Sequence, residues 1–357
     1  MCTVATKSEQ LSAFASRMDQ AMNEASLMLM LSLGHRTGLL DTMAAMESAT
    51  SEEIARRAKL NERYVREWLG AMFTGGIVEL DAEANTYRLP PRHAHWLTRG
   101  GLGDNYASLA QWIGLLGSAE DLVAEAFKHG QGVPYSAYRR FHEVMAEESE
   151  HTVVNALEEH ILPLVPGLTQ RLEEGIEVAD VGCGRGEAAL RLATLFPNSR
   201  FTGLDFSEDA IAAAMTEASE RGLSNVRFML QDAGDWNARG QFDLVLAFDA
   251  VHDQIDPGRV LENIYSALRE DGVFLMQDIG ASSHTHQNKD HAMGTFLYTI
   301  SCMHCMSVSL ASGGAGLGAV WGKELAIDML DHAGFSNVAV EELPHDDMNY
   351  YYVCEKE

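Results

Sequence analysis

Asp180-Val-Gly-Cys-Gly-Arg-Gly186 is the stretch that decides the fold of this chain. It ends a short apolar run, 176–181, and precedes a segment, 187–196, whose apolar residues have helical spacing. Glycines at alternate positions let the backbone turn sharply and approach a bound molecule closely. A strand, a glycine-rich turn and a helix in this order predict the first unit of a doubly wound α/β sheet, with a ligand site at the turn.

Apolar runs that alternate with helical stretches continue this pattern through the second half of the chain. Strands are expected at 201–205, 226–230, 242–248 and 272–276. Helices between successive strands imply crossovers, so the sheet is expected to be parallel and covered on both faces. The last two runs, 337–342 and 349–355, are separated only by a short polar loop, which predicts an antiparallel hairpin.

An acidic residue stands at the end of each predicted parallel strand, where ligands of such sheets bind. These residues are Asp180, Asp205, Asp232, Asp249 and Asp278. A dinucleotide loop needs a third glycine where this chain has Glu187, and a phosphate loop needs lysine followed by serine or threonine. Carboxylates also repel phosphates. The pattern therefore favours a cationic nucleoside without phosphate, a description that S-adenosylmethionine meets, with Asp205 on the ribose hydroxyls and Asp232 on the adenine amino group.

The first hundred residues have a different pattern. Residues 11–33 form a methionine-rich amphipathic helix, and 49–58 and 62–73 are two short helices followed by a hairpin at 77–89. This order is typical of a winged helix, which suits dimerisation, roofing of a site or DNA binding. The second short helix carries two arginines and two glutamates, and the chain has a net charge of −26. Both argue against a nucleic-acid or anionic-membrane partner, since these require a basic surface.

Composition indicates a cytoplasmic protein. No charged-then-apolar segment with a cleavage site opens the chain, and its apolar runs are too short to span a bilayer. Five scattered cysteines do not make a disulfide framework in a chain of 357 residues.

The glycine loop, Asp205, the pair Gln231-Asp232 and the final hairpin resemble the class I S-adenosylmethionine-dependent methyltransferases. The winged helix, the stretch 248–254 and the glycine-rich stretch 314–322 resemble a bacterial two-domain subgroup of them. The resemblance implies a Rossmann-like seven-stranded sheet with its last strand antiparallel, an N-terminal winged-helix domain and a homodimer. It implies that the cofactor site contains Asp180, Gly182, Cys183, Gly184, Gly186, Asp205, Phe206, Asp232, Ala233 and Phe248. Some relatives methylate small thiols.

The predicted organisation has three parts. Residues 1–100 hold the N-terminal helix and the winged helix, 101–172 form a helical connector or lid, and 173–357 form the methyltransferase domain. An insertion at 281–322 is expected to close over the methyl acceptor. The predicted reaction is methyl transfer to a small acceptor, with a small thiol as the first hypothesis. A small phenolic or other aromatic acceptor, methylated on oxygen or nitrogen, is the alternative, and a cofactor-sensing winged-helix regulator is an alternative of another class.

The acceptor site is expected to lie above the fourth and fifth strands. His252, Asp249 and His304 are the candidate catalytic residues, although His252 equally fits a helix cap or a packing role. The candidate substrate-binding residues are Tyr138, His142, Tyr298 and Cys305. The stretch Cys302-Met-His-Cys305 lacks a second pair of ligands, so no metal is expected. On one helix, Tyr298, Cys302, Cys305 and Ser309 would share a face and His304 would point elsewhere. The stretch either packs in the core or forms a lid whose His304 or Cys305 touches the acceptor.

Overall fold

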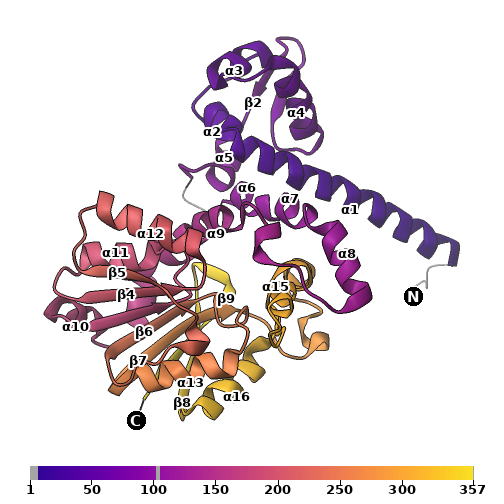
Figure 1. Cartoon of the computed structure of the whole chain (residues 1–357). Coiled ribbons are helices and arrows are strands. Elements are labelled where there is room, and N and C mark those ends of the chain that lie inside the picture. The colour runs from indigo at the N-terminus through magenta and orange to yellow at the C-terminus, as the bar shows by residue number, and fades with distance from the viewer. Residues whose placement is uncertain (1–6, 102–104, 357) are drawn as a thin grey trace, which may run out of the picture. The chain divides into compact units, whose positions relative to one another are not determined.

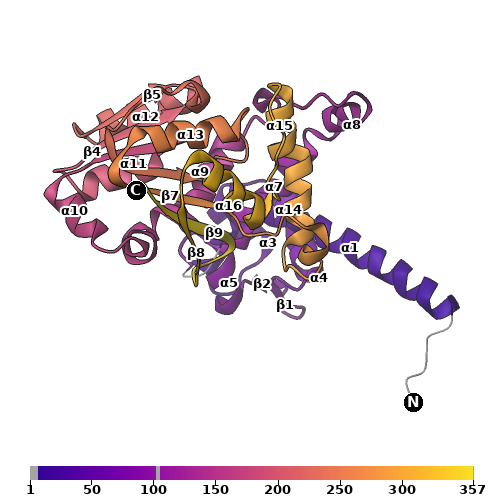
Figure 2. The same ribbon diagram turned by 90° about the horizontal axis from the view of Figure 1, so that it is seen from below.

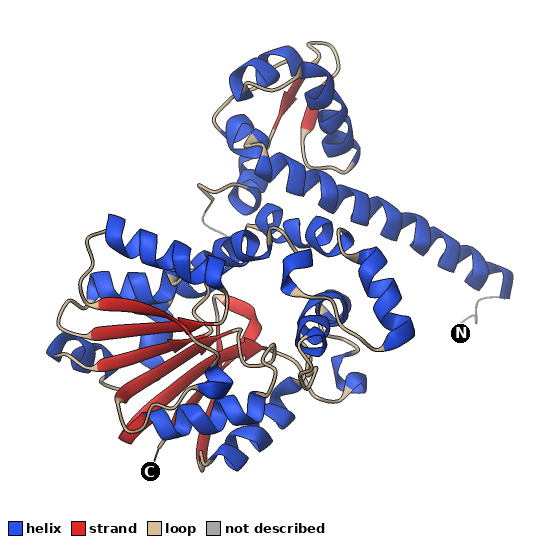
Figure 3. Ribbon diagram, viewed as in Figure 1, coloured by secondary structure: helices blue, strands red, loops and turns tan. Residues whose placement is uncertain are grey.

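The structure is a computed structural model that describes residues 7–101 and 105–356. The chain divides into two compact units, Met1–Gly117 and Ser118–Glu357. The predicted connector, 101–172, is therefore divided between them, because its first part packs with the winged helix and the rest packs with the methyltransferase sheet. Figure 3 shows the two short strands of the first unit and the large sheet of the second.

The first unit is a winged helix preceded by one long helix. Thr50 caps the first short helix and forms a capping box with Glu53, and Asn61 caps the second. The Trp68 indole donates a hydrogen bond of 2.8 Å to the Met30 carbonyl, which fixes the second short helix on the long one. The elements are α1 (Lys7–Arg36), α2 (Leu39–Ala44), α3 (Ser51–Ala58), α4 (Glu62–Thr74), β1 (Glu79–Asp81), β2 (Thr86–Arg88), α5 (Pro91–Leu97), α6 (Tyr106–Leu109) and α7 (Gln111–Gly117).

The second unit is built on a seven-stranded sheet with the order β5-β4-β3-β6-β7-β9-β8. All neighbours are parallel except β9, which runs antiparallel to both β7 and β8. The expected sheet and its final hairpin are thereby confirmed. The strands are β3 (Glu177–Val181), β4 (Arg200–Asp205), β5 (Val226–Leu230), β6 (Phe242–Phe248), β7 (Leu268–Ile279), β8 (Asn337–Leu343) and β9 (Asp346–Glu355).

Helices cover both faces of this sheet, as crossover connections require. On one face lie α10 (Leu168–Glu174), α11 (Glu187–Leu195) and α12 (Glu208–Glu220), and on the other lie α13 (Pro257–Ala267) and α16 (Gly322–Ala333) (Figure 1). Each face has its own apolar core, so the carboxyl ends of the central strands are held rigidly from two sides.

The predicted helical connector is interrupted before it reaches the sheet. After α8 (Glu120–His129) the chain makes a 3-10 turn, Tyr135–Ala137, and only then enters α9 (Phe141–Ser149). Two π-helical turns follow, Glu150–Val154 and Leu157–Ile161. Tyr138 lies between the turn and α9, and this break lets Tyr135 point toward the same pocket as α9.

The insertion after β7 consists mainly of one interrupted helix. Figure 2 shows α14 (Gly294–Ile300) and α15 (Met306–Ala311) as a continuous column. Between them, Ser301–Cys305 forms a π-helical turn, so the Cys302-Met-His-Cys305 stretch lies within a helix, but not within a regular α-helix. None of the helices in the described parts of the chain is long and apolar enough to cross a membrane.

Ser199 offers a test of how firmly the sheet is anchored. Its fully buried hydroxyl donates to the Leu172 carbonyl at 2.6 Å and accepts from the Ile176 amide at 3.0 Å, so it joins α10 to the entrance of β3. Ser199→Ala leaves both backbone groups without this partner and should lower the free energy of unfolding by about 2 kcal/mol. A thermal melt should show a midpoint roughly 5 °C lower. Thr216→Ala, which removes an exposed hydroxyl bonded only to its own helix, should shift it far less; equal shifts would contradict this account.

Candidate active site

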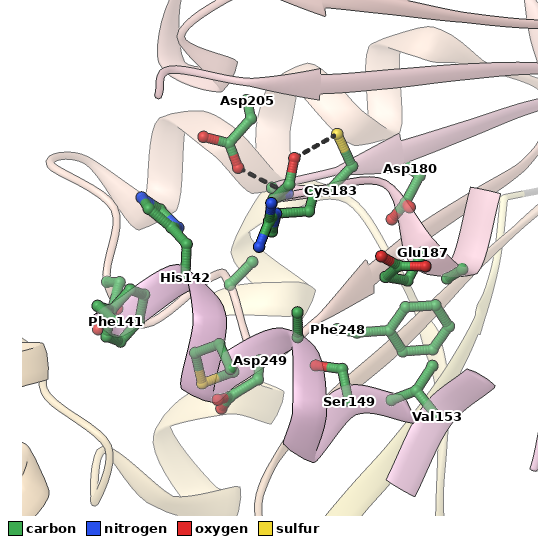
Figure 4. A pocket seen from close by; sticks show the side chains of 18 of the residues that line it. Phe141, His142, Ser149, Val153, Asp180, Cys183, Glu187, Asp205, Phe248 and Asp249 are labelled. Atoms are coloured by element: carbon green, nitrogen blue, oxygen red, sulfur yellow. Dashed lines mark hydrogen bonds between the residues drawn. The ribbon is translucent and has the colours of Figure 1, made fainter. Parts of the chain in front are cut away.

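A pocket lies at the carboxyl ends of β3, β4 and β6, with α9 and the first π-helical turn as its opposite wall (Figure 4). The side toward the sheet contains carboxylates and the glycine loop, and the opposite side is mainly apolar and aromatic. The lining residues used below are Tyr135, Phe141, His142, Asp180, Gly182, Cys183, Gly184, Glu187, Asp205, Phe206, Phe248, Asp249 and Asp253.

The glycine loop adopts the backbone conformations that its composition predicts. Gly182, Gly184 and Gly186 have φ values of 71°, 52° and 78°, in the left-handed region that favours glycine. A Cβ at Gly182 would come within 2.4 Å of the Ala250 side chain, whereas one at Gly184 would meet no protein atom within 4 Å. The Gly184 amide donates to Asp205 at 2.9 Å, so the loop and the end of β4 fix each other (Figure 4).

Carboxyl groups dominate the cofactor end of the pocket. Burial, together with the nearby Asp205 charge, raises the pKa of Asp180 to about 7. Burial also raises the pKa of Glu187. The only positive lining side chain among the described residues is Arg185, apart from any charge on histidine. Such a site fits a cation with ribose hydroxyls and no phosphate, so Asp180, Asp205 and the loop amides are suited to hold S-adenosylmethionine.

Behind the other end of the pocket, His252 lies buried among three aspartates. Its Nδ1 donates to Asp278 at 2.8 Å, and its Nε2 lies 3.2 Å from Asp253 Oδ1 and its Nδ1 3.8 Å from Asp249 Oδ1. Burial alone would lower the pKa of His252, but the Asp278 and Asp253 charges outweigh it and hold that pKa well above its usual range. His252 is therefore a buried imidazolium at neutral pH.

His304 has the opposite character because aromatic rings surround it. It stacks on Phe141 at a centroid distance of 4.1 Å and meets Tyr135 and Tyr138 edge-on. Burial lowers the pKa of His304 to about 4, against the raising effect of Asp253. It is neutral at physiological pH and too weakly basic to be an effective general base.

The structure gathers most predicted cofactor residues into one pocket but not all of them. Gly186, Asp232 and Ala233 are outside the lining: Asp232 caps a short 3-10 turn that follows β5, and Ala233 is buried in the core. Among the candidate catalytic residues, Asp249 lines the pocket, whereas His252 and His304 stand directly behind its wall.

The four candidate substrate-binding residues are separated. His142 lines the pocket, and Tyr138 is buried and donates a hydrogen bond to the Met303 carbonyl. Tyr298 lines a different groove, together with Cys302 and Phe127, which is at odds with its predicted role. Cys305 is buried near His252 and Asp253.

The prediction that Tyr298, Cys302 and Cys305 share one helix face is therefore wrong. A π-helical turn has more residues per turn than an α-helix, so side chains after it point in other directions than α-helical spacing predicts. Cys302 faces the groove, whereas His304 and Cys305 face the pocket side. The sequence carries no composition signal for such a turn.

Sequence reasoning missed two contributors to the site. Tyr135 donates a hydrogen bond of 2.8 Å to Asp253, which is 118 positions away in the chain. Trp321, at the end of the insertion, donates to Asp278 at 2.9 Å. For Tyr135, the sequence carries one weak signal, an aromatic residue directly after Pro134. The pairing of Tyr135 with Asp253 depends on tertiary structure.

Side chains that could bind a metal ion form two groups here. One consists of His252, Asp253 and Cys305, and the other of Asp249, His252 and Asp278. Both groups contain His252, whose ring nitrogens lie 2.8 Å from Asp278 and 3.2 Å from Asp253. We interpret the groups as one ion-pair network.

Comparisons with known proteins agree with this geometry. Residues 25–99 match an Rv2258c-like winged HTH domain, and residues 172–334 match a methyltransferase domain. The human N-acetylserotonin methyltransferase structure, in complex with S-adenosylmethionine, is similar over 100% of this chain and 99% of its own, with a TM-score of 0.70 and 16% identity. The mitomycin 7-O-methyltransferase structure is similar over 98% of this chain and 99% of its own, with a TM-score of 0.66 and 16% identity.

Curated relatives match over shorter stretches. The trans-aconitate 2-methyltransferase of Deinococcus radiodurans is 34% identical over 32% of this chain and 40% of its own length. The malonyl-[acyl-carrier protein] O-methyltransferase of Bacillus cereus is 26% identical over 43% of this chain and 51% of its own length. The chain thus spans about half or less of the length of these relatives.

The fold, the glycine loop and the carboxylates define the class I S-adenosylmethionine-dependent methyltransferases. The chain has the two-domain arrangement in which a winged helix-turn-helix domain precedes a methyltransferase domain.

The raised pKa of Asp180 predicts that cofactor binding depends on pH. At pH 5.5 this carboxyl is mostly protonated, and it must lose its proton to pair with a cation. With a pKa of about 7, S-adenosylmethionine should bind about tenfold more tightly at pH 7 than at pH 5.5. Calorimetry in buffers of different ionisation enthalpy should detect the released proton. Asp180→Asn should bind weakly with little pH dependence; an unchanged pH dependence in this variant would rule Asp180 out.

Proposed function

We propose that this protein transfers the methyl group of S-adenosylmethionine to a small acceptor, and that the acceptor is a small thiol. S-adenosylmethionine supplies an electrophilic methyl carbon on a sulfonium sulfur. The residues around it have to bind the two reactants in line and exclude water.

The observation that carries the choice of a thiol is the state of the two histidines. His252 keeps its proton between Asp278 and Asp253, and the pKa of His304, at about 4, makes it a poor base. Neither can take a proton readily from an alcohol or phenol at neutral pH. A thiol needs less help, because it is nucleophilic and partly ionised near neutral pH.

The walls at this end also suit a small, weakly polar acceptor. Tyr135, Phe141 and Phe206 supply aromatic surface, and Tyr135 contacts both of the others. The hydrogen bond between Tyr135 and Asp253 closes the pocket toward His252. Sulfur makes favourable contacts with aromatic ring edges.

Methylation of a small hydroxylated metabolite is the second candidate. It is favoured by the relatives, several of which are named O-methyltransferases, and by the pair of His252 and Asp278. In that case Asp253 would have to move from Nε2, so that His252 could lose its proton and act as the base.

A winged-helix regulator receives no support from the charges on α4. Arg63 pairs with Glu67 and Arg66 with Glu62, both within the helix. Each arginine is thus matched by its own neighbour, and this helix offers no net positive charge to a phosphate backbone.

The acceptor can be tested with methyl-labelled cofactor and matched panels of small thiols, phenols and amines. We expect turnover with thiols, and at pH 7 a rate at least tenfold above that with any phenol of similar size. Turnover confined to phenols would establish the second candidate instead. Tight, salt-sensitive binding to duplex DNA without methyl transfer would point to the regulator.

We further propose that the protein forms a homodimer through α1. Large apolar side chains recur along this helix at spacings of three, four and seven and are exposed in the single chain. They are Leu11, Phe14, Met18, Met22, Leu29 and Leu33, with Met22 70% exposed. An exposed apolar stripe of this length on a helix is typical of a surface that a second copy covers.

Light scattering during gel filtration should therefore give about twice the chain mass of 39.2 kDa. Phe14→Glu combined with Met22→Glu places two charges in the stripe and should yield monomers. Gln20→Glu, a charge elsewhere on α1, should leave the dimer intact. A wild-type monomer at micromolar concentration would contradict the proposal.

A further inference from the structure

We propose that Asp253 is the catalytic residue that accepts the acceptor's proton, and that Tyr135 positions it. This inference rests on the proposed function and concerns the same pocket. It assigns to His252, the more obvious candidate, the role of a fixed positive charge behind the reacting group.

Asp253 faces the pocket, and His252 does not. Asp253 is among the lining residues together with Tyr135, whereas the His252 side chain is 1% exposed and lies behind them. An acceptor in the pocket therefore meets the Asp253 carboxylate before it meets the imidazole. The position of Asp253 is defined from two sides, by Tyr135 at 2.8 Å on Oδ2 and by His252 at 3.2 Å on Oδ1.

One oxygen of Asp253 can accept a further hydrogen bond. Its contact with His252 is an ion pair, and within the described residues Oδ1 receives no well-directed hydrogen bond, although the atom is buried. A carboxylate oxygen has two lone pairs, so Oδ1 can accept a second donor beside the His252 contact. A bound S–H or O–H group can be that donor.

The acidic groups and the thiol packed around His252 fit this division of roles. Asp278 at the end of β7 holds Nδ1, Asp249 at the end of β6 lies beyond it, and Cys305 of the π-helical turn is close by. Burial raises the pKa of Cys305 to about 12, so this thiol keeps its proton, and burial also raises the pKa of Asp249 well above its usual range. His252 is thus charged, and Asp253 is the ionised carboxylate that faces the acceptor.

A carboxylate of low basicity is sufficient for this reaction. The acceptor sulfur forms a bond to the methyl carbon while that carbon's bond to the sulfonium sulfur breaks, and the bonding pair stays on the departing sulfur. As the new bond forms, positive charge develops on the acceptor sulfur and its S–H becomes strongly acidic. Burial would raise the pKa of Asp253, but His252 lowers it to about 2. A carboxylate of that pKa can still take this proton late in the transfer and release it to water afterwards.

The principal test is Asp253→Asn, which keeps the size of the side chain and removes the proton acceptor. With the panel acceptor on which the wild type is most active, we expect kcat to fall at least 100-fold and S-adenosylmethionine affinity to change less than threefold. Retention of kcat within threefold would overturn the role of Asp253. Absence of any thiol turnover by the wild type is a separate result, which overturns the proposed function instead.

Tyr135→Phe supplies a second measurement in case Asp253→Asn disturbs folding. Loss of the hydroxyl removes a donor that lowers the pKa of Asp253, so the acid limb of the kcat profile should move to higher pH and kcat should fall about tenfold.

Tyr351→Phe is the matched control, because Tyr351 is also buried and also donates to an aspartate, Asp346, at 2.8 Å, but lies outside the pocket. Its acid limb should stay in place. Equal shifts in both variants would reduce Tyr135 to a structural role and overturn its positioning role.

Discussion

A positive charge buried at His252 is the interaction on which the proposed acceptor end of the pocket depends. Burying an imidazolium is costly unless carboxylates surround it closely, and here they come from separate elements. Asp278 lies at the end of β7, Asp253 lies in the loop after β6, and Trp321, from the far end of the insertion, donates to the same Asp278 oxygen as His252. The charge therefore ties the strand ends to the insertion that covers them.

The two ends of the pocket use acidic residues in different ways. At the cofactor end, no basic side chain in the described part of the chain forms an ion pair with Asp180 or Asp205, so a cationic ligand would supply the missing charge. At the acceptor end, Asp253 and Asp278 are already paired with His252. The proposed acceptor end therefore suits a neutral acceptor. In the proposed reaction the methyl group would leave the sulfonium beside the unpaired carboxylates and move toward the end where the carboxylates are already paired with His252.

The sequence predicts the architecture well because its signals are local. Strand length, the glycine loop and an acid at the end of β3 and of β4 all lie within a few residues of one another, and the structure has them as expected. The acceptor end is different. Tyr135 meets Asp253 only because the chain bends before α9, and the Asp278 contact of Trp321 spans the whole insertion. Such pairings depend on packing between distant segments, which periodicity does not record.

The π-helical turn at Ser301–Cys305 has a consequence for how this insertion can change in length. Such a turn amounts to one residue added to an α-helix, and each residue rotates the following side chains by about 100°. Loss of one residue here would restore a regular helix and turn His304 or Cys305 out of its present place beside Phe141 or His252. We therefore expect the segment to tolerate many substitutions more readily than a single deletion. The pocket depends on the number of residues in this turn more than on their unusual composition.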